Sequence, residues 1–86
     1  MSLMIPTIHL NGTSKGELRK QLETAAHALT QAADALGCSA PNGRDYYPQG
    51  DNAFNEAVRE HSVRVEKIRS VHKEIMAIWE GIEGQG

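Results

Sequence analysis

The sequence predicts an all-α protein, an antiparallel two-helix hairpin that follows an extended N-terminal arm and associates into a helical bundle. Two long segments repeat apolar residues in alternating steps of three and four, which is typical of helices that pack along one seam. A segment with two prolines and two glycines separates them, and 86 residues are enough for only one domain. The whole chain, residues 1–86, is therefore expected to form a single helical-hairpin domain.

Residues 1–12 are predicted to form the extended arm. β-branched residues surround Pro6, which cannot donate a backbone hydrogen bond within a sheet, and Asn11-Gly12 is a typical turn pair. Any strand here is expected to be an edge strand or an isolated extended piece.

The first helix is predicted over residues 13–36. Ser14 and Glu17 have the spacing of a capping box, and Gly37 can take the left-handed conformation that closes a helix. Between these ends, one apolar stripe contains Leu18, Leu22, Ala25, Leu29, Ala32 and Leu36.

Residues 37–50 are predicted to be a connector without a long regular element. Arg44, Tyr46 and Tyr47 are candidate interaction residues, because Arg and Tyr are enriched in binding hot spots. Two interpretations remain open. Either one tyrosine covers the open end of the hairpin while Arg44 pairs with Asp45, or the tyrosines form a contact surface for a protein or for stacked bases.

The second helix is predicted over residues 51–83, with Asp51 or Asn52 as its N-cap. Its apolar stripe runs without a break through Phe54, Val58, His61, Val65, Ile68, His72, Ile75, Trp79 and Ile82. Folding the two helices about the connector places Phe54 near Leu36 and His72 near Leu18.

In that register the second helix extends past the start of the first helix, and its apolar tip needs a cover. The arm is predicted to fold back over Trp79 and its neighbours, using Ile5, Ile8 and Leu10, because each large apolar side chain buried contributes about 1.5–3 kcal/mol.

A two-helix hairpin leaves one side of its seam open, and the stripe of the second helix widens after Ile68. This widening predicts a homo-oligomer, for which a four-helix arrangement is the simplest symmetric solution. The candidate interaction residues on this helix are Val71, Ile78, Trp79 and Ile82.

Charge and composition argue against several classes of function. Nine basic and eleven acidic residues give a net charge of −2, so strong generic binding to nucleic acid is disfavoured. We expect no membrane span and no secretory signal, and hence a cytoplasmic protein.

The sequence offers no evident metal, cofactor or catalytic site. Cys38 is the single cysteine, and His61 and His72 lie eleven residues apart, about 16 Å along a helix, so one ion cannot bridge them. We therefore expect no enzyme, unless an oligomer gathers His27, His61 or His72 with carboxylates.

Two short segments of the chain are Thr7-Ile-His-Leu-Asn-Gly-Thr-Ser14 and Pro41-Asn-Gly-Arg-Asp-Tyr-Tyr47. With these segments the chain resembles a group of small uncharacterised proteins of tailed bacteriophages and prophages. The resemblance implies a bacterial cytoplasm during infection or lysogeny, a place in or near the virion, another phage or host protein as a partner, and a role in particle assembly. It carries over no catalytic residue.

Together these observations favour a non-enzymatic, phage-type helical interaction or assembly module that acts by oligomerisation and protein contacts. The alternative is a nucleic-acid-associated accessory protein that uses Arg44, Tyr46, Tyr47 and basic residues of the helices.

Overall fold

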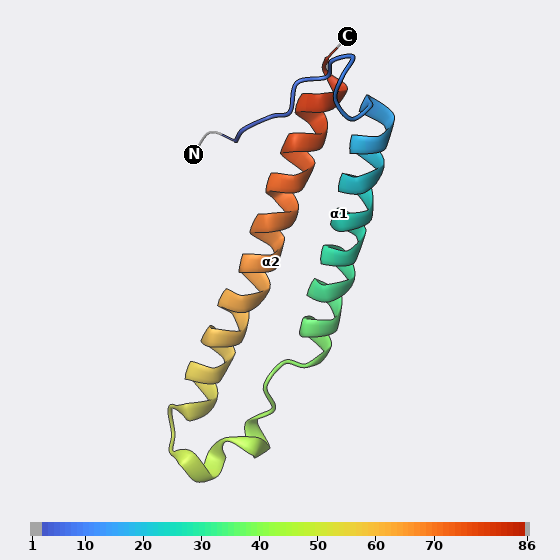
Figure 1. Cartoon of the computed structure of the whole chain (residues 1–86). Coiled ribbons are helices and arrows are strands. Elements are labelled where there is room, and N and C mark those ends of the chain that lie inside the picture. Colours follow the sequence, from blue (N-terminus) through green and yellow to red (C-terminus); the bar gives the residue numbers. More distant parts are fainter. Residues whose placement is uncertain (1–2, 86) are drawn as a thin grey trace.

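The computed structural model describes residues 3–85, so residues 1 and 2 of the predicted arm lie outside the described residues. Two long antiparallel helices, α1 (Lys15–Cys38) and α2 (Ala53–Glu83), make up most of the molecule (Figure 1). Two short 3-10 turns, η1 (Gly43–Asp45) and η2 (Tyr47–Gln49), lie in the connector. No strand occurs within residues 3–85, and the predicted helical hairpin is confirmed.

Helix α1 has the cap that its sequence predicts, but it begins at Lys15, two residues later than predicted, and it ends two residues later, at Cys38. The Ser14 hydroxyl accepts a hydrogen bond from the backbone N–H of Glu17 at 3.1 Å, which caps the first turn. The helix then continues through Gly37, which has no left-handed conformation, because Ser39 closes it instead. Both the backbone N–H and the hydroxyl of Ser39 donate to the carbonyl of Leu36, at 3.0 and 2.9 Å.

The connector, residues 39–52, contains no long regular element, as predicted. Asn42 starts η1 by accepting a hydrogen bond from the N–H of Arg44 at 3.1 Å. Gly50 follows η2 with φ of 118°, a conformation that suits glycine. Helix α2 starts at Ala53, two residues later than predicted, and it ends at Glu83 as predicted.

The predicted register of the two helices is wrong. Glu23 of α1 lies beside Trp79 of α2, whereas the predicted pairing would have put it opposite Lys67, twelve residues earlier. At 1.5 Å per residue this displacement is about 18 Å, more than three helical turns.

The connector explains the error, because it does not reverse the chain at once. It continues along the hairpin axis beyond α1 before α2 begins (Figure 1). Gly37, near the end of α1, shares a shallow groove with His61 and Val65 of α2, so the turns of α2 before His61 have only the connector beside them. The uncovered part of α2 therefore lies at the connector end of the hairpin and not at the arm end.

The arm is fastened at the opposite end of the hairpin. The side-chain amide of Gln85 accepts from the N–H of Ile8 at 2.8 Å and donates to the carbonyl of Pro6 at 2.6 Å. Ile5 lies against Gly81, where an added Cβ would be 2.9 Å from Ile5 Cγ2. The predicted covering of the end of α2 by the arm is thus correct for Ile5.

The prediction that the arm covers the end of α2 is wrong for Leu10, which is 98% exposed. The Asn11-Gly12 turn forms as expected, with the N–H of Gly12 donating to the carbonyl of His9 at 3.2 Å. This turn directs the chain away from α2 before it enters α1. Trp79 is instead held by α1, through the hydrogen bond to Glu23.

Candidate interaction surface

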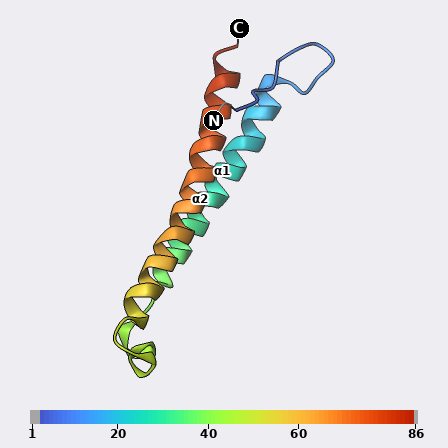
Figure 2. The ribbon, with the colours of Figure 1, turned by 90° about the vertical axis from the view of Figure 1, so that its left-hand side faces the viewer.

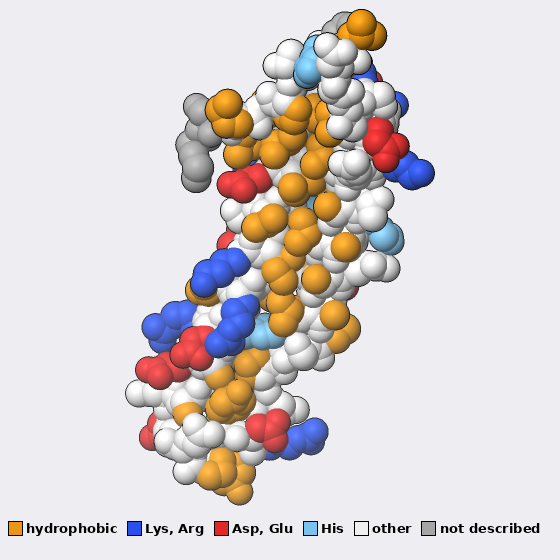
Figure 3. Space-filling view, viewed as in Figure 1, with side chains coloured by type: hydrophobic (Ala, Val, Ile, Leu, Met, Phe, Trp, Pro, Cys, Tyr) orange, Lys and Arg blue, Asp and Glu red, His pale blue; other side chains and the backbone are white. Residues whose placement is uncertain are grey.

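The apolar side chains of the helices form a long strip along the seam between them, which we call the apolar strip (Figure 3). Most of these side chains are only half-buried. Within residues 3–85, Ala26 and Ile82 alone are buried. The strip consists of Leu18, Leu22, Ala25, Leu29 and Leu36 of α1 with Val65, Ile68, Ile75, Ile78 and Trp79 of α2.

The total solvent-accessible surface area is large for a chain of this mass, as expected for an elongated hairpin with few buried residues. The solvent-accessible surface is 6506 Å², whereas a compact folded chain of 9.4 kDa exposes about 5,000 Å². The excess is about 1,500 Å², and a standard protein interface covers about 800 Å² on each partner. The excess, which includes polar and apolar surface, is therefore larger than one partner's share of a standard interface.

The two ends of the hairpin add separate exposed apolar groups to the strip. Met4 and Leu10 are exposed at the arm end. Phe54 and Val58 are exposed at the connector end, where α2 has no helix beside it, and Tyr47 of the connector is 77% exposed. The apolar surface thus extends over the length of the hairpin.

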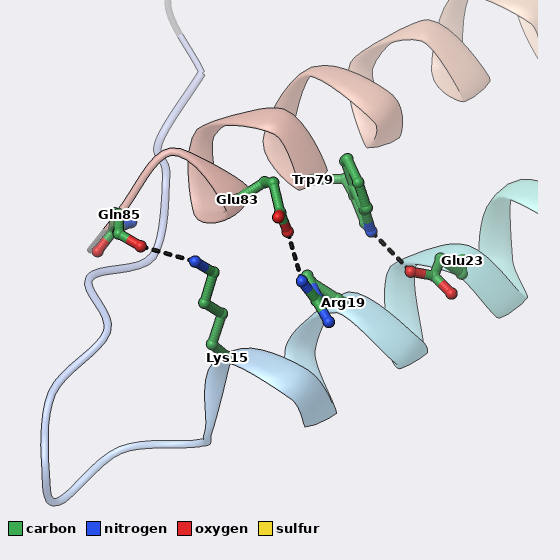
Figure 4. A network of polar contacts seen from close by, with 6 residues as sticks. All are labelled: Lys15, Arg19, Glu23, Trp79, Glu83 and Gln85. Carbon is green, nitrogen blue, oxygen red and sulfur yellow. Dashed lines mark hydrogen bonds and ion pairs between the residues drawn. The ribbon is translucent and has the colours of Figure 1, made fainter.

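Polar contacts fix the register at the arm end of the strip. Figure 4 shows Lys15, Arg19 and Glu23, spaced one turn apart on α1, facing α2 and the residue Gln85 beyond its end. The ammonium of Lys15 donates to the carbonyl of Gln85 at 2.7 Å, and the guanidinium of Arg19 donates to the carboxylate of Glu83 at 2.5 Å. The carboxylate of Glu23 accepts from the indole N–H of Trp79 at 2.9 Å.

One of these pairs is ionic. The hydrogen bond from Arg19 lowers the pKa of Glu83 below its ordinary value, and the same hydrogen bond raises the pKa of Arg19. Both side chains remain partly exposed, so the pair fixes geometry more than it adds stability.

Sequence reasoning missed these contacts, although a signal for them exists. Arg19 and Glu23 are four residues apart on one helix, and Trp79 and Glu83 are four apart on the other. Two complementary pairs with matched spacing predict that the helices align there.

The predicted interaction residues of α2 have different environments. Val71 is exposed, and Ile78 and Trp79 are half-buried. Ile82 has 0% exposure, so in the single chain it packs inside and offers no contact surface.

The predicted interaction residues of the connector lie at the other end of the molecule. Tyr46 is half-buried, whereas Arg44 and Tyr47 are exposed. No ion pair joins Arg44 to Asp45 among the described residues. The structure therefore does not bring the two predicted groups together within one chain, whose length is 62 Å.

The histidines do not form a metal site in the part of the chain that the structure describes, where no group of three or more His, Cys, Asp or Glu side chains could hold an ion. His61 borders the groove beside Gly37, and its Nε2 is buried without a hydrogen-bond partner. His72 is half-buried on the same helix.

Neither helix between residues 3 and 85 is long and apolar enough to cross a membrane. Comparison of the chain with protein-family models, curated proteins and solved structures found no match.

Proposed function

We propose that this chain is a helical assembly module that acts by self-association and protein contacts and catalyses no reaction. The observation that carries the proposal is the apolar strip, which runs along the hairpin and is only partly buried in the single chain. Covering such a strip is the main favourable contribution available to a chain that buries so little by itself.

The small core supports the proposal that a partner stabilises the fold. Ala26 and Ile82 are the two buried residues between positions 3 and 85. An association that covers the half-buried apolar strip would add the hydrophobic stabilisation that the single chain does not reach by itself. We therefore expect folding and association to be coupled.

The resemblance to small phage proteins suggests a setting for this activity. A self-associating hairpin suits a role in building or stabilising a phage particle inside a bacterial cell, with another phage or host protein as a further partner. The exposed connector residues Arg44 and Tyr47 are the side chains that we expect to meet such a partner.

Light scattering coupled to gel filtration tests the proposal directly. The expected mass is a whole-number multiple of 9.4 kDa that is greater than one, with helical circular dichroism that weakens on dilution. A well-folded monomer at millimolar concentration would contradict it.

A second candidate function is association with nucleic acid. Arg59, Arg64 and Lys67 surround a shallow hollow on α2, and only Arg64 has an acidic partner within it, Glu60 at 3.8 Å. Such a cluster can contact phosphates, although the chain as a whole is acidic. A gel-shift series at low salt tests this candidate, and the absence of any complex there would eliminate it.

A further inference from the structure

We infer that the apolar strip is covered by a second copy of this chain, which lies face to face and antiparallel, so that the arm turn (residues 9–12) of each copy lies against the connector end of the other. The inference rests on the proposed self-association and adds the orientation of the two copies and a composite surface that neither copy has alone.

The uncovered area fits a partner of the same size. The excess surface of about 1,500 Å² per chain is more than the roughly 800 Å² per partner that a standard interface buries. One face of the hairpin measures 62 by 24 Å. A second hairpin has the same length and the same strip, so one two-fold axis completes a four-helix arrangement.

The two ends of the hairpin differ in what lies beside α2, which favours the antiparallel arrangement. At the arm end, the arm lies on α2 beside the start of α1. At the connector end, α2 before His61 has no helix beside it, and Phe54 and Val58 are exposed. Antiparallel pairing puts the arm-bearing end of one copy against the end of the other copy where α2 has no neighbouring helix.

The arm turn supplies a steric reason for the same choice. In Figure 2 this turn projects beyond both helices, toward the side of the molecule that Figure 3 faces. Leu10 is at its tip, almost completely exposed. In a parallel face-to-face pair the two turns would meet at one end and hold the strips apart, whereas in an antiparallel pair each turn lies against the connector end of its neighbour.

The antiparallel pair also gives Leu10 and Tyr47 a common environment. In one chain these two exposed apolar side chains lie at opposite ends of the hairpin. Across the two-fold axis, Leu10 of one copy comes close to Tyr47 and Phe54 of the other. Arg44 lies on the same connector, so the composite surface combines apolar, aromatic and cationic groups.

Cysteine cross-linking between copies tests the orientation. In a Cys38→Ser background, a mass-tagged Leu10→Cys chain is mixed with an untagged Tyr47→Cys chain and oxidised. We expect disulfide-linked heterodimers of tagged and untagged chains. A Thr24→Cys chain, whose substituted side chain is exposed on α1, is the matched control and should not link to Leu10→Cys.

A spin label at Leu10→Cys gives an independent distance. The antiparallel arrangement predicts a separation between the two labels close to the 62 Å length of the hairpin. The parallel arrangement predicts a separation within its 24 Å width.

The outcomes separate the inference from the proposed function. A dimer in which Leu10→Cys links to a second Leu10→Cys chain overturns the antiparallel arrangement and leaves self-association intact. A dimer in which Leu10→Cys does not link to Tyr47→Cys does the same. A monomer by light scattering overturns both the antiparallel arrangement and the proposed self-association.

Discussion

The contact between the arm and α2 can be tested by adding one methyl group at Gly81. The Cβ of Gly81→Ala would lie 2.9, 3.1 and 3.1 Å from three side-chain carbons of Ile5. Carbon atoms in contact are normally about 3.5–4.0 Å apart, so Ile5 must move away.

Two effects of opposite sign follow from this substitution. Alanine in place of glycine inside a helix stabilises it by up to about 1 kcal/mol. Displacing Ile5 costs part of the roughly 1.5–3 kcal/mol that full burial of such a side chain contributes, because Ile5 is half-buried. The free energy of unfolding should therefore change little, whereas the arm should detach.

Hydrogen exchange at the amide of Ile8 measures the arm directly, because this amide donates to the Gln85 side chain. We expect protection in the natural chain and its loss in Gly81→Ala. Gly37→Ala is the matched control, since Gly37 lies within a helix and an added Cβ meets nothing within 4 Å. It should raise stability and leave the amide of Ile8 protected.

A double variant makes the test specific. Ile5→Ala removes the three carbons that the new methyl group would meet, so the effects of Ile5→Ala and Gly81→Ala on stability should not be additive. Unchanged protection of Ile8 in Gly81→Ala, or additive effects in the double variant, would refute the contact.

Three further predictions concern the helices. Stability from the Arg19–Glu83 pair should be present above pH 4.5, the ordinary carboxyl pKa, and be lost as the pH falls through the lowered pKa of Glu83. The free energy of unfolding of Glu83→Gln, measured against pH, should lack this acid-dependent contribution. A pH dependence equal to that of the natural chain would contradict the ion pair. Ser14→Ala should cost about 1 kcal/mol by removing the N-cap of α1, measured by urea denaturation, and a neutral result would argue against the cap. Trp79→Phe should lower the free energy of unfolding by about 0.5–1.5 kcal/mol, because it removes the hydrogen bond to Glu23. If the same substitution lowered the free energy of unfolding equally in a Glu23→Ala background, the bond would not form.

The sequence predicts the helices well because their signals are local. The Ser14 cap, the apolar stripes and the interrupted connector each depend on residues within a few positions of one another. The end of α1 escaped prediction, because the signal from Gly37 competes with hydrogen bonds from Ser39 that also satisfy the last carbonyls.

The register escaped prediction for a different reason. A stripe that repeats every three or four residues has nearly the same appearance after a shift of whole turns, so the apolar pattern alone permits several alignments. The connector and the contacts of Arg19 and Glu23 select one of them. The predicted site was affected in turn, because Trp79 and Ile82 became part of the packing against α1 and the arm.

The elongated outline of the hairpin has a consequence for its behaviour in solution. The radius of gyration is 18.6 Å, against about 12 Å for a compact chain of this length. A lone protomer should therefore sediment slowly and elute early, as a larger sphere would. Stacking a second rod on its broad side would double the mass while the longest dimension stayed near 62 Å, a signature that small-angle X-ray scattering separates from end-to-end growth.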